Sequence, residues 1–195
     1  RSGIDEVVFV DDDPDRVGET VDGVEVIGTN ERLADFDPAD NECAVAFGDE
    51  PGIRLELSDR VRESGLDLFT VVDSDATIAE TATVGTGSIV TAQAYIGPGA
   101  MLDELVLLDS AASVSHDAHL GRGVTVGPNA TIAGGVDIST DAYVGAGATI
   151  LDDLTVGREA IIGAGATVIN DVPRETTVTG VPARPLDQQG EYREA

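Results

Sequence analysis

Aliphatic residues return at every sixth position from residue 72 onward. Each sixth residue is Leu, Ile or Val, and the position two before it is nearly always small or apolar, most often Ala. A period of six cannot be an α-helix, whose apolar stripe returns every 3.6 residues, but it is typical of a short strand and a corner turn repeated around a solenoid. The aliphatic positions are Val72, Ile78, Val84, Val90, Ile96, Leu102, Leu108, Val114, Leu120, Val126, Ile132, Ile138, Val144, Ile150, Val156, Ile162 and Val168.

Each repeat is expected to bury two side chains. Alternate residues of a strand face the same side, so the small residue and the aliphatic one point inward and the residue between them points outward. Three hexads make one triangular coil, and these seventeen hexads predict between five and six coils of a hexapeptide-repeat solenoid. Glycine often follows the aliphatic residue, where we expect the chain to turn and where Gly costs least. These glycines are Gly85, Gly97, Gly121, Gly127, Gly145, Gly157 and Gly163.

The first 71 residues lack this period and predict a small α/β domain. Residues 6–10 indicate a strand that ends in an acidic turn, and residues 21–28 indicate a tight turn leading into a short strand. Residues 43–48 indicate a second, buried strand. Residues 51–65 begin with Pro and end with Gly, which predicts an amphipathic helix. Its apolar face is expected to hold Ile53, Leu57 and Val61. Strand, helix and strand in this order favour a parallel sheet.

The pattern divides the chain into three parts. Residues 1–71 form the α/β domain, residues 72–172 form the mainly β solenoid, and residues 173–195 form a C-terminal tail. The six-residue frame stops at Pro173. We expect the tail to cover the strand edges that the last coil would otherwise expose.

Charge is the most unusual feature of the composition. The chain has 37 acidic and 11 basic residues, all of the basic ones Arg, and a formal net charge of −26. Nucleic acid is therefore not an expected partner. An acidic surface without Lys is similar to that of proteins from salt-accumulating haloarchaea, and we expect folding to need molar salt that screens the self-repulsion. The alternative is an ordinary acidic soluble enzyme.

Several classes of protein are not expected from the sequence. Cys43 is the single cysteine, so a disulfide or a cysteine metal cluster is excluded. No segment is apolar enough for membrane insertion, and no basic leader opens the chain, so a cytoplasmic location is expected. The first residue is Arg rather than Met, which suggests that the chain begins inside a longer or processed one.

Four motifs together resemble the sugar O-acyltransferase family, which includes sialic acid O-acetyltransferases and UDP-4-amino-sugar N-acetyltransferases. They are FVDDDP at 9–14, VDGVEVIG at 21–28, SHD at 115–117 and GVPARP at 180–185. The resemblance implies a left-handed parallel β-helix preceded by an incomplete Rossmann-like domain. It also implies a homotrimer, with acetyl-CoA bound between adjacent solenoids and a nucleotide sugar, expected to be UDP-linked, bound on the N-terminal domain.

Within that resemblance, His116 matches the catalytic base and Asp117 its acidic neighbour. A histidine that titrates near neutrality suits proton removal from an attacking amine or hydroxyl, and a carboxylate can hold one ring nitrogen protonated so that the other accepts. Position alone leaves open that His116 is a surface imidazole at a corner. His119 is expected to face outward, as a solvated or trimer-interface residue.

Other candidate site residues follow from the resemblance only. Thr125, Gly134, Ala146 and Ala164 match acetyl-CoA contacts, and Asp11, Asp12 and Gly48 match nucleotide-sugar contacts. Small residues at solenoid corners and an acidic turn explain the same positions without a ligand. The family differs in two ways: its members begin with a glycine-rich loop before the segment that opens this chain, and many carry a second histidine where Thr125 stands.

The sequence therefore predicts an acetyl-CoA-dependent sugar acetyltransferase, with transfer to an amine favoured over transfer to a hydroxyl. No metal is expected, because the zinc enzymes built on hexapeptide repeats need three imidazole ligands and this chain has two histidines. The alternative is a noncatalytic trimeric scaffold or binding protein that kept the fold.

Overall fold

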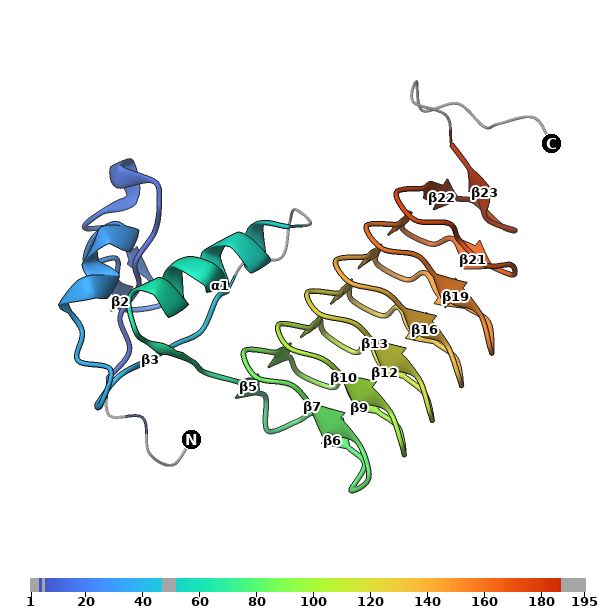
Figure 1. Cartoon of the computed structure of the whole chain (residues 1–195), viewed down its shortest axis with the longest axis horizontal. Helices are drawn as coiled ribbons and strands as arrows, with labels where there is room; N and C mark the ends of the chain where they lie inside the picture. The colour runs from blue at the N-terminus through green and yellow to red at the C-terminus, as the bar shows by residue number, and fades with distance from the viewer. Residues whose placement is uncertain (1–3, 5, 47–51, 187–195) are drawn as a thin grey trace. The chain divides into compact units, whose positions relative to one another are not determined.

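The solenoid consists of stacked coils with three flat faces. The computed structural model describes residues 4, 6–46 and 52–186, and Figure 1 shows the coils following one another from β5 to β22. The first face holds β5 (Val71–Val72), β8 (Ile89–Val90), β11 (Leu107–Leu108), β14 (Thr125–Val126), β17 (Tyr143–Val144), β20 (Ile161–Ile162), β22 (Thr177–Thr179) and β23 (Arg184–Pro185). The second face holds β6 (Thr77–Ile78), β9 (Tyr95–Ile96), β12 (Ser113–Val114), β15 (Thr131–Ile132), β18 (Thr149–Ile150) and β21 (Thr167–Val168). The third face holds β7 (Thr83–Val84), β10 (Met101–Leu102), β13 (His119–Leu120), β16 (Asp137–Ile138) and β19 (Thr155–Val156).

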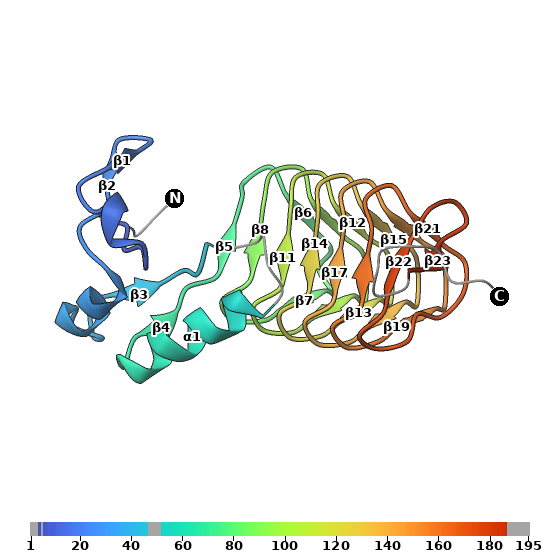
Figure 2. The same cartoon turned by 90° about the horizontal axis from the view of Figure 1, so that it is seen from above.

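From β5 to β21, each coil advances the chain by eighteen residues. Ser113 pairs with Thr131 in parallel register, and Thr131 pairs in turn with Thr149, a step of 18 each time. The predicted period of six is thus one face and one corner, and three such units complete the coil. Within a coil the first corner follows the first face, the second corner follows the second face, and the third corner returns the chain to the first face, as Figure 2 shows from above.

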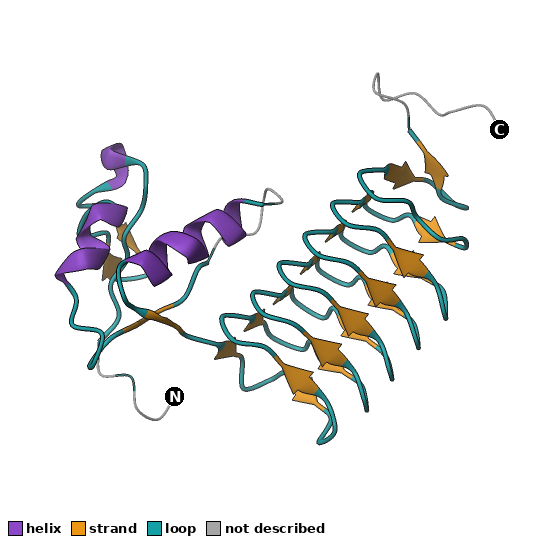
Figure 3. Ribbon diagram, in the orientation of Figure 1, coloured by secondary structure: helices purple, strands orange, loops and turns teal. Residues whose placement is uncertain are grey.

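The interior is as the period predicts, except at its beginning. Ala130 and Ile132 are fully buried, whereas Thr131 between them is exposed. Val72 was expected to point into the core but is 45% exposed, because it lies in the first coil and no earlier coil covers it. Figure 3 shows this stack of strands and loops continuing without a helix.

Glycines at the corners have a different role from the expected one. Gly97 and Gly121 do not have positive φ; instead, a Cβ on either would lie 2.8 Å from the backbone of the next coil. Left-handed backbone occurs two residues later, and there it is often adopted by a residue other than Gly, such as Asp117 with φ 57°. Glycine directly after the aliphatic residue therefore permits close stacking of coils rather than the turn itself.

The chain after Pro173 extends the first face. β22 pairs in parallel with β20, and β23 returns antiparallel to β22. The edge of β20 is thereby paired instead of open, which removes a template for unwanted strand pairing.

The chain divides into two compact units, Arg1–Cys43 with Leu57–Leu68, and Ala44–Glu56 with Phe69–Ala195. In the first unit, β1 (Thr20–Val21) and β2 (Val24–Glu25) form a hairpin through Asp22 and Gly23, both at positive φ as a two-residue Asp-Gly turn requires. The predicted tight turn is therefore confirmed. The short 3₁₀ helices η1 (Pro14–Arg16) and η2 (Asn30–Asp35) flank this hairpin in the chain.

The predicted order of strand, helix and strand is present. β3 (Glu42–Cys43) pairs in parallel with β4 (Asp67–Leu68), and α1 (Ile53–Glu63) lies between them in the chain. Residues 6–10 contribute one parallel bridge, from Phe9 to Val26. The expected parallel sheet is therefore confirmed between β3 and β4. The strand expected at residues 6–10 is reduced to this one bridge in the part of the chain that the structure describes.

The buried stripe of α1 differs from the predicted one. Arg54, Ser58 and Val61 are buried, whereas Ile53 and Leu57 are only half-buried. The stripe is shifted by one residue because Arg54 takes a buried position that apolar periodicity cannot identify. No helix among the described residues is long and apolar enough to cross a bilayer.

Truncation of one core residue tests the stacking. Ile132→Ala should lower the free energy of unfolding by about 3 kcal/mol. The backbone pairing fixes the spacing of the coils, so they cannot close the cavity that the shorter side chain leaves. Thr131→Ala, on the same strand but facing outward, should change it by less than about 0.5 kcal/mol. Denaturant unfolding at one fixed salt concentration checks both, and equal losses would contradict the assigned inward and outward positions.

Candidate active site

His116 and Asp117 form a side-chain pair at the second corner of one coil. Nδ1 of His116 lies 3.0 Å from Oδ2 of Asp117. A carboxylate can only accept, so in the neutral ring this contact places the hydrogen on Nδ1 and leaves a lone pair on Nε2. The two side chains are 61% and 75% exposed, so a substrate in solvent can reach the ring. This is the arrangement that a general base needs.

Glycines of the neighbouring coils make room for this pair. A Cβ on Gly134, one coil later, would lie 2.5 Å from Cε1 and 2.6 Å from Nε2 of His116. A Cβ on Gly99, one coil earlier, would lie 2.5 Å from Oδ1 of Asp117. The ring and the carboxylate therefore lie against backbone that carries no side chain.

His119 has a different environment from His116. It faces outward from β13, as predicted, with its side chain 37% exposed. Nδ1 lies 3.2 Å from Asp137, and Nε2 lies 3.3 Å from Asp103. Each ring nitrogen of His119 therefore lies beside a carboxylate, one from Asp137 of β16 and one from Asp103, which follows β10.

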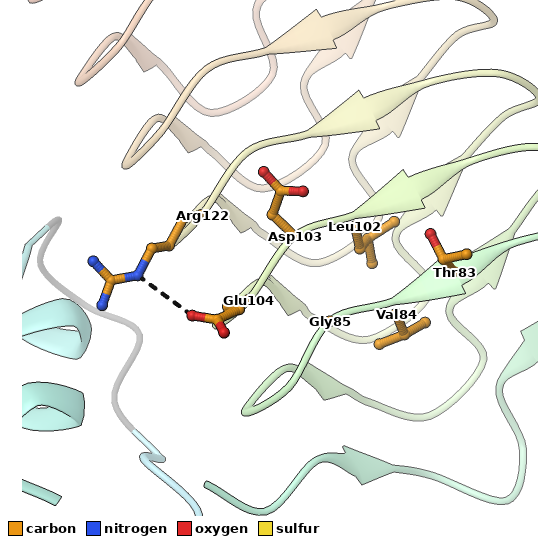
Figure 4. A pocket seen from close by; sticks show the side chains of 7 residues that line it. All are labelled: Thr83, Val84, Gly85, Leu102, Asp103, Glu104 and Arg122. Atoms are coloured by element: carbon orange, nitrogen blue, oxygen red, sulfur yellow. Dashed lines mark ion pairs between the residues drawn. The ribbon is translucent and has the colours of Figure 1, made fainter. Parts of the chain in front are cut away.

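Figure 4 shows a hollow on the third face that includes Asp103, the residue next to Nε2 of His119. Arg122 and Glu104 point toward each other across it, with Arg122 Nε 3.8 Å from Glu104 Oε2. Asp103, Leu102 and residues 83–85 complete its lining. None of the predicted site residues lines this hollow, so we do not place the reaction there.

The predicted acetyl-CoA contacts lie on different parts of the solenoid. Ala146 and Ala164 are exposed at the first corner of successive coils, while Gly134 lies at the second corner. The glycines after the two alanines, Gly147 and Gly165, would find nothing within 4 Å of an added Cβ. An exposed ridge of small residues fits the narrow pantetheine arm of acetyl-CoA, which could approach the backbone there.

Thr125 is buried on the first face, away from the corner of His116. Its Oγ1 accepts a hydrogen bond of 2.9 Å from the guanidinium of Arg54. Nine residues separate His116 from Thr125, which is half of an 18-residue coil, so the two positions lie on opposite sides of the triangle. One copy of the chain does not bring them together.

Arg54 is a buried cation that the sequence analysis missed. It donates to the carbonyls of Leu105, Gly123 and Val124 as well as to Thr125, at 2.7 to 3.3 Å.

Burial lowers the pKa of Arg54 to about 10, and the charge of Asp141 acts in the opposite direction. Burial also raises the pKa of Asp141, although the backbone N–H of Gly52, which donates to it at 2.8 Å, counteracts this. Arg54 and Asp141 thus fasten the first turn of α1 to the solenoid.

The predicted nucleotide-sugar residues are only partly described. Oδ2 of Asp11 pairs with Arg16 at 2.5 Å, and its Oδ1 accepts from the backbone of Asp13 at 3.0 Å. Asp12 is exposed. Gly48 lies outside the described residues. The acidic turn that served as the alternative explanation is therefore present, and a sugar contact by Asp11 or Asp12 stays a prediction.

In the described part of the chain, no group of three or more His, Cys, Asp or Glu side chains is arranged to hold a metal ion.

No family model and no curated protein sequence matches the chain. Solved structures do match. The acetyltransferase domain of PglB from Neisseria gonorrhoeae, in complex with acetyl coenzyme A, is 35% identical with a TM-score of 0.88, over 93% of this chain and 87% of that one. PerB from Caulobacter crescentus, in complex with CoA and GDP-perosamine, is 28% identical with a TM-score of 0.86, over 92% and 84%. This chain belongs to the sugar acetyltransferases of the hexapeptide-repeat superfamily.

A third member of this family that the chain resembles is WeeI from Acinetobacter baumannii, 27% identical with a TM-score of 0.77, over 92% of this chain and 85% of that one. The predicted family and fold class are confirmed: the solenoid is the left-handed parallel β-helix of these acetyltransferases. Further structures of the Caulobacter enzyme are of variants in which one histidine is replaced by Ala or Asn.

Removal of the Arg54 side chain tests its structural role. Arg54→Ala should lower the free energy of unfolding by about 3 kcal/mol, because it removes the donor to the carbonyls of Leu105 and Gly123 and to the Thr125 hydroxyl. Arg60→Ala, which removes an exposed Arg from the same helix, is the matched control and should cost less than about 0.5 kcal/mol. Thermal and denaturant unfolding measure both, and similar values would show that the Arg54 contacts contribute little.

Proposed function

We propose that this sugar acetyltransferase moves the acetyl group of acetyl-CoA to an amine of a nucleotide-linked amino sugar, with His116 as general base. The observation that carries the proposal is the His116–Asp117 contact at an exposed corner, with Nε2 left to accept a proton. The complexes of PglB with acetyl coenzyme A and of PerB with CoA and GDP-perosamine support the donor and the class of acceptor. We expect UDP as the nucleotide and treat GDP as the alternative to be compared.

The reaction is a direct transfer. The acceptor nitrogen forms a bond to the acetyl carbon, Nε2 of His116 takes the proton that this nitrogen loses, and the carbon–sulfur bond breaks to release the CoA thiolate. Asp117 keeps Nδ1 protonated and stabilises the imidazolium that forms. The proton then leaves His116 to the thiolate or to solvent, so the free enzyme is restored. Backbone N–H groups at the corners are the donors available for the developing oxyanion.

The acetyl-CoA contacts would be shared between copies of the chain. Thr125, Gly134, Ala146 and Ala164 lie at a flat face and two different corners of one solenoid, so adjacent copies must contribute different members of this set if all four contact one donor molecule. The register thus supports the homotrimer expected from the resemblance. In the sugar site, Asp11, Asp12 and Gly48 remain the proposed contacts on the N-terminal unit.

Loss of the base should abolish most of the activity. His116→Ala should lower the rate of thiol release from acetyl-CoA by about 10²-fold or more, the usual effect of removing a general base. His119→Ala is the matched control, because it removes the other imidazole of the same coil and should retain activity within a few-fold. Assays at high salt with UDP-linked and GDP-linked 4-amino sugars, and with hydroxy sugars of the same type, measure the rate and compare the acceptors.

The same assay separates the enzyme from the scaffold alternative. Full activity in His116→Ala would remove this residue from the mechanism. Absence of thiol release with every acceptor, also in a version extended at its N-terminus, would favour the noncatalytic scaffold.

Assembly is tested by mass in solution. We expect three copies of the 20.1 kDa chain, about 60 kDa by light scattering at high salt. A monomer that is fully active would contradict the sharing of acetyl-CoA contacts between copies.

A further inference from the structure

Among the described glycines, Gly134 is the one at which an added Cβ would overlap the His116 ring. An added Cβ would meet Cε1, Nε2 and Nδ1 of this ring, at 2.5, 2.6 and 3.2 Å, and these are its three nearest atoms. At Gly97, Gly121, Gly127 and Gly145 the nearest atoms are instead backbone of the next coil. Gly134 is buried although it lies at a corner, in direct contact with the exposed imidazole.

The backbone of Gly134 cannot retreat to make space. Its N–H donates to Oδ1 of Asp152 at 3.1 Å, and its carbonyl accepts from the N–H of Asp153 at 2.9 Å. The next N–H, of Gly135, donates to the carbonyl of His116 itself at 3.0 Å. Gly134 is therefore fixed to the coils on both sides, and its distance from the backbone of His116 is set by the stacking.

The ring, by contrast, can move. The His116 side chain is 61% exposed, and among the described residues its side-chain partner is Asp117. A methyl group at position 134 would push the ring toward solvent, and the contact between Nδ1 and Asp117 would be lost or lengthened.

We propose that Gly134 is a positioning residue for the reaction. Because it has no side chain, the His116 imidazole can take the orientation in which Nδ1 contacts Asp117 and Nε2 faces the acceptor. The inference rests on the proposed role of His116 as base. It assigns to Gly134 a role different from the acetyl-CoA contact expected from the family resemblance. Gly99 makes similar room for Asp117, but its φ of 72° would strain any substitution, so Gly134 is the position that can be tested.

The backbone of Gly134 is outside the left-handed region, so Ala is compatible with its conformation. Gly134→Ala should lower kcat by about 10²-fold, the cost of misplacing a reacting group by about 1 Å. The KM for acetyl-CoA should change by less than about twofold, and the melting temperature should be nearly unchanged because the ring moves into solvent. Kinetics use the nucleotide-linked amino sugar on which the unchanged chain is most active.

The imidazoles give a second, ligand-free readout. The chain has two histidines, so its proton NMR spectrum contains two imidazole Cε1–H signals, and the one missing in His116→Ala belongs to His116. In Gly134→Ala that signal should shift while the His119 signal stays. Gly134→Ala combined with His116→Ala is the matched control and should be no slower than His116→Ala alone.

The outcomes separate the two proposals. A raised KM for acetyl-CoA with kcat retained and an unmoved His116 signal would overturn the positioning role and make Gly134 a donor contact. A further loss of rate when Gly134→Ala is added to His116→Ala would overturn it as well. Full activity in His116→Ala would instead refute the proposed function, and the His116 signal in Gly134→Ala would still report whether the ring depends on this glycine.

Discussion

The structure depends on the hydrogen bonds that join each strand to the strand eighteen residues later. A two-residue strand has almost no stability by itself, and here it persists because its backbone is paired on both sides by the coils before and after it. The pairing sets the distance between coils, and that distance limits the size of the side chains that fit in the interior and at the corners. Ala and one aliphatic residue per face fill the interior, and Gly occupies corners where the next backbone comes closest.

This stacking also determines which residues meet. A side chain has its neighbours at positions 18 before and 18 after its own, more than at positions adjacent in sequence. His116 and Gly134 are related in this way, as are Asp117 and Gly99. The His116–Asp117 pair is thus formed by two adjacent residues, but glycines from two other coils leave the space that it occupies. A search of the sequence for residues near SHD would not find them, whereas a search at a spacing of eighteen would.

The sequence predicts the repetitive part of the fold well because a strict period leaves few alternatives. The period assigns the aliphatic residue at every sixth position to the interior, and all of these residues from Val90 to Val168 are buried. The first 71 residues have no such redundancy. There the predictions of the helix and of the tight turn hold, since both are local, but the pairing of Phe9 with Val26 is decided by contacts that no local pattern encodes.

The burial of Arg54 could not be predicted from the sequence for a related reason. Apolar periodicity assigns a charged residue to the outer face, and nothing in the sequence shows that carbonyl groups of residues 105, 123 and 124 converge on one point. Such carbonyls become available at corners where the chain turns. A long, many-donor side chain can satisfy several of them at once, which offsets the cost of burying its charge.

The two histidines of one coil show how the register distinguishes chemically identical side chains. His119 pairs in register with Met101 and Asp137, and the carboxylates of Asp103 and Asp137 occupy both of its ring nitrogens. His116 has Gly134 in the following coil and a single carboxylate, that of its own neighbour. A base needs one nitrogen fixed and the other open, so only His116 is suited to proton transfer. Gly134 contributes to this difference, because a side chain at its position in the next coil would meet the His116 ring.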